Sequence, residues 1–227
     1  MNRDAPPSVD EILDDRTRFF CIGLNYADHV SETGRDRASH PTVFVRFASS
    51  MVGPGADIVV PSASDHLDYE GELAVVIGRP GRAIDPADAL GYVAGYTCLL
   101  DGSVRDFQNH TSQFTPGKNF DATGAVGPLV VPAVELGVPS DGWRITSTVS
   151  GDVLLDSATD HMIFPVPELI AYLSTFTELR RGDVIATGTP SGVGVARSPR
   201  RFLRPGDTIA VEIAGIGTLT NPVVAEP

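Results

Sequence analysis

The sequence has few of the features that mark several large classes of protein. It contains 2 cysteines among 227 residues, and both lie in apolar stretches typical of buried thiols in a reducing compartment rather than of a disulfide framework. No apolar run approaches the roughly 20 residues that a membrane helix needs. Residues 1–15 are polar and acidic, without the apolar segment of a signal peptide. We therefore expect a cytoplasmic protein with no membrane partner.

Positive charge is also scarce. Lysine and arginine number 17 against 29 acidic residues, which gives a formal net charge of -12. A nucleic-acid surface needs a stripe of basic residues to neutralise phosphates, so we expect no nucleic-acid partner. Lys118 is the only lysine, which indicates either a lysine-specific requirement at this position or a composition biased toward arginine.

Long helical patterns are few. Glycine (23) and proline (18) separate many short apolar segments, such as residues 73–77 and 93–100, and the clearest helical spacing covers residues 168–176. We expect a mainly β fold with a few short helices, arranged as a compact roll or sandwich rather than as a doubly wound parallel sheet. We divide the chain into an N-terminal arm, residues 1–17, and a single domain, residues 18–227.

Two glutamates, Glu70 and Glu72, stand where a polar segment enters an apolar strand. On a strand they project from the same face about 7 Å apart, so their charges repel unless a proton, a cationic side chain or a metal ion lies between them. Asp101 ends a second apolar segment and could supply a third carboxylate. An all-oxygen site suits Mg²⁺, Mn²⁺ or Ca²⁺, and open positions for water and substrate favour a catalytic Mg²⁺ or Mn²⁺. The alternative for the two glutamates alone is a solvated strand face.

Six segments together resemble one known family. They are GLNYADH (residues 23–29), DYEGEL (68–73), DGSVRDFQ (101–108), GKNFD (117–121), TGTPSGVG (187–194) and PGD (205–207). They follow the family's order and approximate spacing over residues 19–226. The sequence thus resembles the catalytic C-terminal domain of the fumarylacetoacetate hydrolase family, of the acylpyruvase and 2-hydroxyhepta-2,4-diene-1,7-dioate isomerase type.

The resemblance implies a mixed β-sandwich roll, a homodimer, and Mg²⁺ or Mn²⁺ held by Glu70, Glu72 and Asp101. Family members act on small 2-oxo and β-diketo acids, some of them in aromatic catabolism. Such an acid can chelate the ion through its keto and carboxylate oxygens, which places the cation beside negative charge that forms on the keto oxygen. Lys118 matches the family's active-site lysine and would donate a hydrogen bond or a proton as that charge develops.

The resemblance also assigns roles around the metal. His29 and Glu32 would lie on one helical turn, where the carboxylate orients the imidazole as a general base for water. The positions expected to contact substrate oxygens or to support Lys118 are Arg46, Arg105, Gln108 and Thr189. Many relatives carry lysine at position 46 and a larger residue at position 102, so Arg46 and Gly102 are departures that bear on the substrate rather than on the metal.

The leading expectation is a metal-dependent hydrolase that cleaves a carbon-carbon bond in acylpyruvate-like β-diketo acids, with the pyruvate enolate as leaving group. The alternatives need no activated water: an oxaloacetate-type decarboxylase, or an isomerase or decarboxylase of unsaturated dicarboxylic 2-oxo acids in aromatic degradation. There, Arg46 and Arg35 would hold a second carboxylate. A non-catalytic metal-binding homologue is a third alternative, and the intact set of expected site residues argues against it.

Overall fold

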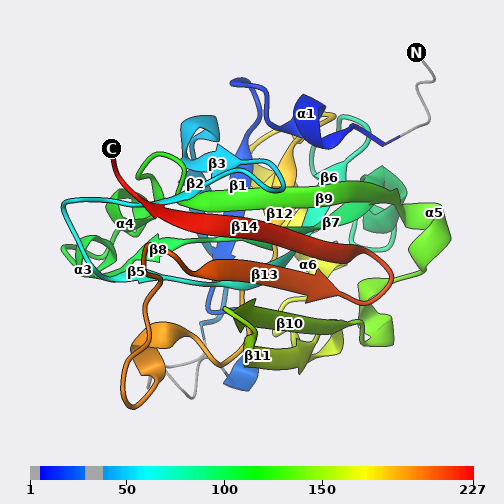
Figure 1. The fold of residues 1–227 in the computed structure, drawn as a ribbon. Helices are drawn as coiled ribbons and strands as arrows, with labels where there is room; N and C mark the ends of the chain where they lie inside the picture. Colours follow the sequence, from blue (N-terminus) through cyan, green and yellow to red (C-terminus); the bar gives the residue numbers. More distant parts are fainter. Residues whose placement is uncertain (1–5, 29–37) are drawn as a thin grey trace.

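The computed structural model describes residues 6–28 and 38–227, most of whose strands form two sheets (Figure 1). The larger sheet contains β1 (Phe19–Gly23), β2 (Thr42–Arg46), β3 (Met51–Val52), β6 (Gly71–Ile77), β7 (Val93–Leu100), β9 (Gly124–Pro132) and β12 (Val184–Ala186), in the order β2-β1-β12-β6-β7-β9-β3. The smaller sheet contains β4 (Ile58–Val60), β10 (Arg144–Val149), β11 (Asp152–Ala158), β13 (Thr208–Ile213) and β14 (Gly217–Ala225), in the order β11-β10-β13-β14-β4. Parallel and antiparallel pairs occur in both sheets, so both are mixed.

The larger sheet has to curl. Its two edge strands, β2 and β3, follow one another in the chain and are joined by Phe47 and the 3₁₀ helix η1 (Ala48–Ser50). The steps from Arg46 to Met51 can span at most about 18 Å of extended chain. Seven flat strands would hold the two edges about 29 Å apart. The connection therefore draws the edges together and gives the sheet an inner and an outer face.

Each face of the curled sheet has its own apolar cluster. On the outer face, Leu73 and Val75 pack with Val211 of the smaller sheet and with helix α6 (Val166–Phe176). On the inner face, residues of even number along β6, such as Ala74, join Phe19, Cys21 and Leu99. Successive side chains of a strand point to opposite faces, so the even-numbered Glu70 and Glu72 belong to the inner face.

The helices are short, and this confirms the mainly β fold expected from the sequence. The helix expected over residues 168–176 is α6, which begins at Val166. The other α-helices that the structure bounds within the described residues are α1 (Val9–Ile12), α3 (Arg105–Gln108), α4 (Thr115–Lys118) and α5 (Ala133–Leu136). The small strands β5 (Leu67–Asp68) and β8 (Ser103–Val104) pair with each other. Figure 1 shows α3, α4, β5 and β8 together at one end of the molecule, with α5 at the other. Among the described helices, none is both long enough and apolar enough to cross a membrane.

The described part of the N-terminal arm packs on the roll. Ser8 and Glu11 form a capping box at the start of α1, in which the Ser8 hydroxyl accepts from the Glu11 amide (3.2 Å) and the Glu11 carboxylate accepts from the Ser8 amide (2.8 Å). Ile12 is fully buried in the inner cluster. The division into an arm and a domain at residue 17 stays a prediction.

Replacing Ile12 by alanine should lower the free energy of unfolding by about 2 to 4 kcal/mol, because it leaves a cavity in the inner cluster. Chemical denaturation of the variant measures this loss. Val134→Ala, at a side chain that is 95% exposed on α5, serves as the control and should change stability by less than about 0.5 kcal/mol. Equal stability of Ile12→Ala and the unaltered protein would contradict the packing of this segment.

Candidate active site

Three carboxylates lie close together on the inner face of the larger sheet, beside the start of β6 and the end of β7. In the antiparallel pairing of β6 and β7, Gly71 lies opposite Leu100. The next pair of residues, Glu70 and Asp101, is joined by a hydrogen bond from the Asp101 amide to the Glu70 carbonyl (2.9 Å). Glu72 lies two residues further along β6. One carboxylate oxygen of each acid lies within 4.8 Å of the others, and all three residues are buried. The structure thus brings Glu70 and Glu72, which strand alternation places on one face, together with Asp101, the third carboxylate expected from the sequence.

Two cations are inserted among these acids. Lys118 Nζ donates to Glu70 Oε2 (2.6 Å) and to Asp101 Oδ2 (2.5 Å). Arg105 Nη2 lies 2.6 Å from Glu70 Oε1. Both side chains are buried, so these are strong charge-assisted contacts. Lys118 thus bridges Glu70 and Asp101, and Arg105 contacts the other oxygen of Glu70.

Glycine and asparagine beside Lys118 explain how its short helix reaches this position. A Cβ at Gly117 would lie 2.4 Å from the Gln108 amide nitrogen, so only glycine lets α4 approach α3 so closely. Asn119 then ties the end of α4 to the sheet, because its side chain accepts from the Phe47 amide (2.6 Å) and donates to the Val45 carbonyl (3.0 Å). Lys118 is therefore fixed from both sides.

Glu72 is the acid with the least compensation. Its Oε2 accepts from the Gly188 amide (2.8 Å), and in the described part of the chain it forms no ion pair. Burial raises its pKa well above the ordinary value, and the charges of Asp101 and Glu70 add to this rise. For Lys118, burial acts to lower the pKa, but Asp101 and Glu70 outweigh it and raise the pKa overall. The cluster therefore lacks positive charge at Glu72.

The donor set fits a divalent ion. Three buried carboxylates lie together, and Glu72, which has no ion pair among the described residues, has a raised pKa that a nearby divalent cation would lower. Hard oxygen donors and no described nitrogen or sulfur donor at this point favour Mg²⁺ or Mn²⁺ over Zn²⁺. That an ion is bound here, and which ion it is, stay predictions.

A cleft of about 290 Å³ opens over the cluster. Its charged and polar lining comes from Glu70, Glu72, Arg105, Gln108, Asn109, Lys118 and Thr189, and its apolar lining from Ile22, Leu24, Phe44, Phe114, Val195 and Ala196. Asp101 is fully buried and does not reach the cleft surface. The cleft is thus an apolar-walled space with a polar floor, the usual character of a small-molecule site.

The expected substrate contacts divide into two groups. Arg105, Gln108 and Thr189 line the cleft, although Arg105 also donates to Asp68 Oδ2 (2.8 Å) and to Gln108 Oε1 (2.8 Å). The position of Arg46 differs from the expected one. Its side chain is fully buried outside the cleft lining, because its guanidinium bonds to Asp101 and to nearby backbone and hydroxyl oxygens. Arg46 therefore has no free donor for a substrate carboxylate.

The expected general-base pair, His29 and Glu32, lies outside the described residues, as does Arg35. Their roles stay predictions.

Two residues of this site carried no role in the sequence analysis. Asp68 accepts from the amides of Gly194 (2.7 Å) and Val195 (2.9 Å) as well as from Arg105, so it connects the loop that forms one wall of the cleft to Arg105. The sequence did carry a signal for Asp68, because it lies two residues before Glu70, and residues two apart on a strand share a face. The Gly188 amide, which bonds Glu72, gives no side-chain signal in a sequence.

The comparisons with known proteins agree with this geometry. A family model, Fumarylacetoacetate (FAA) hydrolase C-terminal, matches residues 18–224. The chain belongs to this family.

Characterised and solved relatives are similar over most of the chain. The mitochondrial oxaloacetate tautomerase FAHD2A of Bos taurus is 42% identical over 206 residues, which cover 90% of this chain and 65% of the bovine protein. This chain thus spans less than two thirds of that relative's length. The 2-hydroxyhepta-2,4-diene-1,7-dioate isomerase of Mycobacterium marinum aligns with a TM-score of 0.81 and 35% identity, covering 92% of this chain and 75% of that one. A fumarylacetoacetate hydrolase from Exiguobacterium antarcticum gives 0.85 and 38%, covering 93% and 76%.

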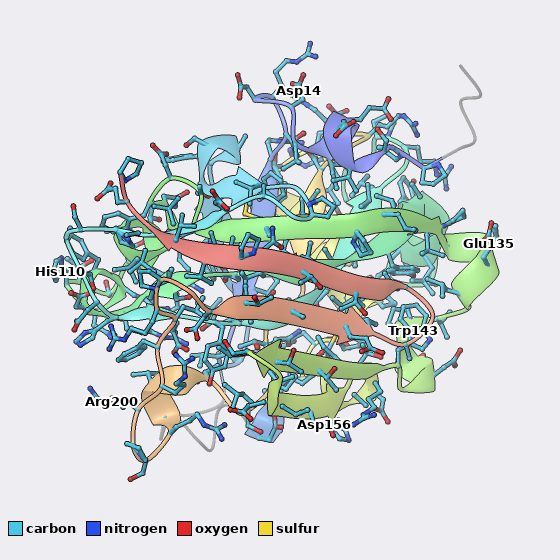
Figure 2. All side chains as sticks on the ribbon, viewed as in Figure 1. Asp14, His110, Glu135, Trp143, Asp156 and Arg200 are labelled. Atoms are coloured by element: carbon cyan, nitrogen blue, oxygen red, sulfur yellow. The ribbon has the colours of Figure 1, made fainter. Side chains whose placement is uncertain are left out.

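Mn²⁺ or Mg²⁺ at about 100 times its Kd should stabilise the protein by about 2.7 kcal/mol, and a chelator should reverse the effect. Thermal unfolding with and without the ion measures this. Glu72→Gln should lose most of the metal-dependent gain, because it removes one charged oxygen donor. Glu135→Gln is the matched control, since Glu135 is exposed on α5 at the far end of the molecule (Figure 2). A protein that is indifferent to both ions would rule out the proposed metal centre.

Proposed function

We propose that this protein is a metal-dependent enzyme of small 2-oxo acids that interconverts their keto and enol forms, as a tautomerase or isomerase. The observation that carries the proposal is the position of Lys118, whose ammonium lies between Glu70 and Asp101 on the floor of the cleft that Glu72 also lines. The relatives named for oxaloacetate tautomerisation and for isomerisation of an unsaturated 2-oxo dicarboxylic acid support this choice of reaction.

Glu70, Glu72 and Asp101 would hold the divalent ion, which would supply Lewis-acid stabilisation of negative charge on the substrate's keto oxygen, worth several kcal/mol. Lys118 presents a proton and a positive charge to the same cleft, held there by its two carboxylate contacts. Arg105 is already engaged by Asp68, Glu70 and Gln108, so it fixes the floor rather than moving with substrate.

Two aromatic rings lie beside Lys118 in the cleft lining. Phe44 lies over Lys118, with the ammonium 4.9 Å from the ring centroid, and Phe114 packs edge-on against Phe44 at 5.8 Å between centroids. These rings lower the local polarity, which strengthens the interaction of Lys118 with a developing negative charge. Thr189, whose hydroxyl donates to the Gly71 carbonyl (3.1 Å), and Gln108 line the cleft, where both would contact substrate oxygens.

Hydrolysis of acylpyruvates, the leading expectation from the sequence, is the second candidate. It shares the metal centre and Lys118 but also needs a base that activates water, for which His29 and Glu32 have suitable spacing. The similarity to a fumarylacetoacetate hydrolase favours keeping it. The expected homodimer and cytoplasmic location stay predictions, and the tautomerase relatives carry a mitochondrial location in their names.

Lys118→Met should lower the rate of enol-to-keto conversion of oxaloacetate by about 10²-fold or more, because it removes the positive charge from the cleft floor. The decay of enol absorbance in metal-loaded protein measures this rate, and Glu135→Gln should behave like the unaltered enzyme. Removal of the ion with a chelator should have an equal or larger effect. Full activity of Lys118→Met would exclude the proposed role.

His29→Ala separates the two candidates. A hydrolysis that depends on activated water should lose about 10²-fold or more in pyruvate release from acylpyruvates, whereas enolisation that depends on the ion and Lys118 should keep most of its rate. Both reactions are measured on one metal-loaded preparation. The unaltered protein could instead release pyruvate in a metal-dependent reaction much faster than it tautomerises oxaloacetate. If His29→Ala also abolishes that release, hydrolysis replaces tautomerisation as the proposed function.

A further inference from the structure

Arg46, at the end of β2, uses every donor of its guanidinium inside the protein. Its side chain has no exposed surface. Nη1 donates to Asp101 Oδ1 (2.6 Å) and the Gly102 carbonyl (2.8 Å), Nη2 to Thr123 Oγ1 (2.9 Å) and the Ser50 carbonyl (3.2 Å), and Nε to Ser50 Oγ (3.2 Å). Arginine has five N–H donors, and five acceptors surround it. Such complete saturation is typical of a fixed structural element.

These acceptors come from different parts of the curled sheet. Ser50 belongs to the short connection between the two edge strands, Asp101 and Gly102 follow β7, and Thr123 precedes β9. Arg46 therefore joins the β2 edge to the β7 and β9 ends at the point where the sheet closes on itself. Asp101 is held within this junction rather than by its own strand alone.

Two glycines leave room for the planar group. A Cβ at Gly124 would lie 2.8 Å from Arg46 Nη2 and 2.9 Å from its central carbon. A Cβ at Gly102 would lie 1.9 Å from the Thr123 carbonyl oxygen, so any other residue there would push apart two of the segments that Arg46 bridges. The space is shaped for a flat, forked cation.

The two oxygens of Asp101 have separate partners. Oδ1 contacts Arg46, and Oδ2 contacts Lys118, whose ammonium also contacts Glu70. Fixing Oδ1 at the guanidinium sets the plane of the carboxylate and thus the direction of Oδ2. Lysine has three donors on a single nitrogen and could not satisfy acceptors spread over five directions.

We propose that Arg46 is a positioning residue that aims the Asp101 carboxylate at the ion site, and that this role requires arginine. The inference rests on the metal centre of the proposed function. Residues that orient metal ligands in this way typically change metal affinity by 10- to 100-fold when they are replaced. Replacement of Arg46 should therefore change the Kd of the ion itself, before any substrate is added.

The test is titration calorimetry of Mn²⁺ into chelator-stripped, full-length protein. Arg46→Lys should weaken Mn²⁺ binding at least about 10-fold. Calorimetry reports the Kd of the folded molecules separately from the fraction that binds, so a role limited to folding would reduce the stoichiometry and leave Kd unchanged. Arg18→Lys is the control, because Arg18 forms a similar forked pair with Asp183 away from the cleft, and its Kd should equal that of the unaltered protein.

Unchanged affinity in folded Arg46→Lys would overturn the inference and leave the metal centre standing. If that variant does not fold, Thr123→Val decides, because it removes one acceptor of the guanidinium without touching Asp101. Thr123→Val should weaken Mn²⁺ binding at least about 3-fold, which is less than the 10-fold loss typical of an orienting residue. Unchanged affinity of this variant would again overturn the role of Arg46. Failure of the unaltered protein to bind Mn²⁺ or Mg²⁺ would instead remove the metal centre, and this inference with it.

Discussion

A chain of alternating buried charges is the constraint on which the site depends. It runs through Asp68, Arg105, Glu70, Lys118, Asp101 and Arg46, with contacts of 2.5 to 2.8 Å between neighbours. A charge buried without compensation costs several kcal/mol, and removal of any inner member would leave the buried chain with a net charge. The three acids and three bases of this chain balance, which makes Glu72 the surplus carboxylate. A divalent ion at Glu72 would complete the cluster.

This chain of charges contributes geometry more than stability. Buried ion pairs recover little beyond the cost of removing both partners from water, and apolar replacements are often as stable. The stability of the roll comes instead from the two apolar clusters on either side of the curled sheet. Glu70 and Asp101 each contact a cation on both oxygens, and Asp68 contacts Arg105 and two backbone amides, so their orientations are set before any ion or substrate arrives. Such preorganisation is what a site that stabilises developing charge requires.

Local sequence patterns predicted the parts of the protein that depend on neighbouring residues. Alternation placed Glu70 and Glu72 on one face, and apolar runs located most strands of the larger sheet, because these features follow from the two-residue repeat of a strand. Strand β14, with Pro222, and the charged edge strand β11 have weak patterns and were not expected. The helix of α6 was found, although its first turn carries Pro167 and its start was set two residues late. The family resemblance predicted that Lys118 and Thr189 belong to the site. The structure was needed to show which contacts hold their side chains in place.

Arg46 shows why the remainder could not be predicted. From the sequence, Arg46 was expected to bind a substrate carboxylate with its forked guanidinium. Its actual acceptors, at positions 50, 101, 102 and 123, could not be recognised because they are far apart in the chain. Only closure of the sheet brings them around one guanidinium. The two departures from the family pattern, Arg46 and Gly102, prove to be joined by a hydrogen bond of 2.8 Å. A bulkier residue at 102 would meet the Thr123 carbonyl, so the arginine and the glycine depend on the same close approach of backbone. Both residues therefore act on the support of Asp101, and neither is among the residues that line the cleft.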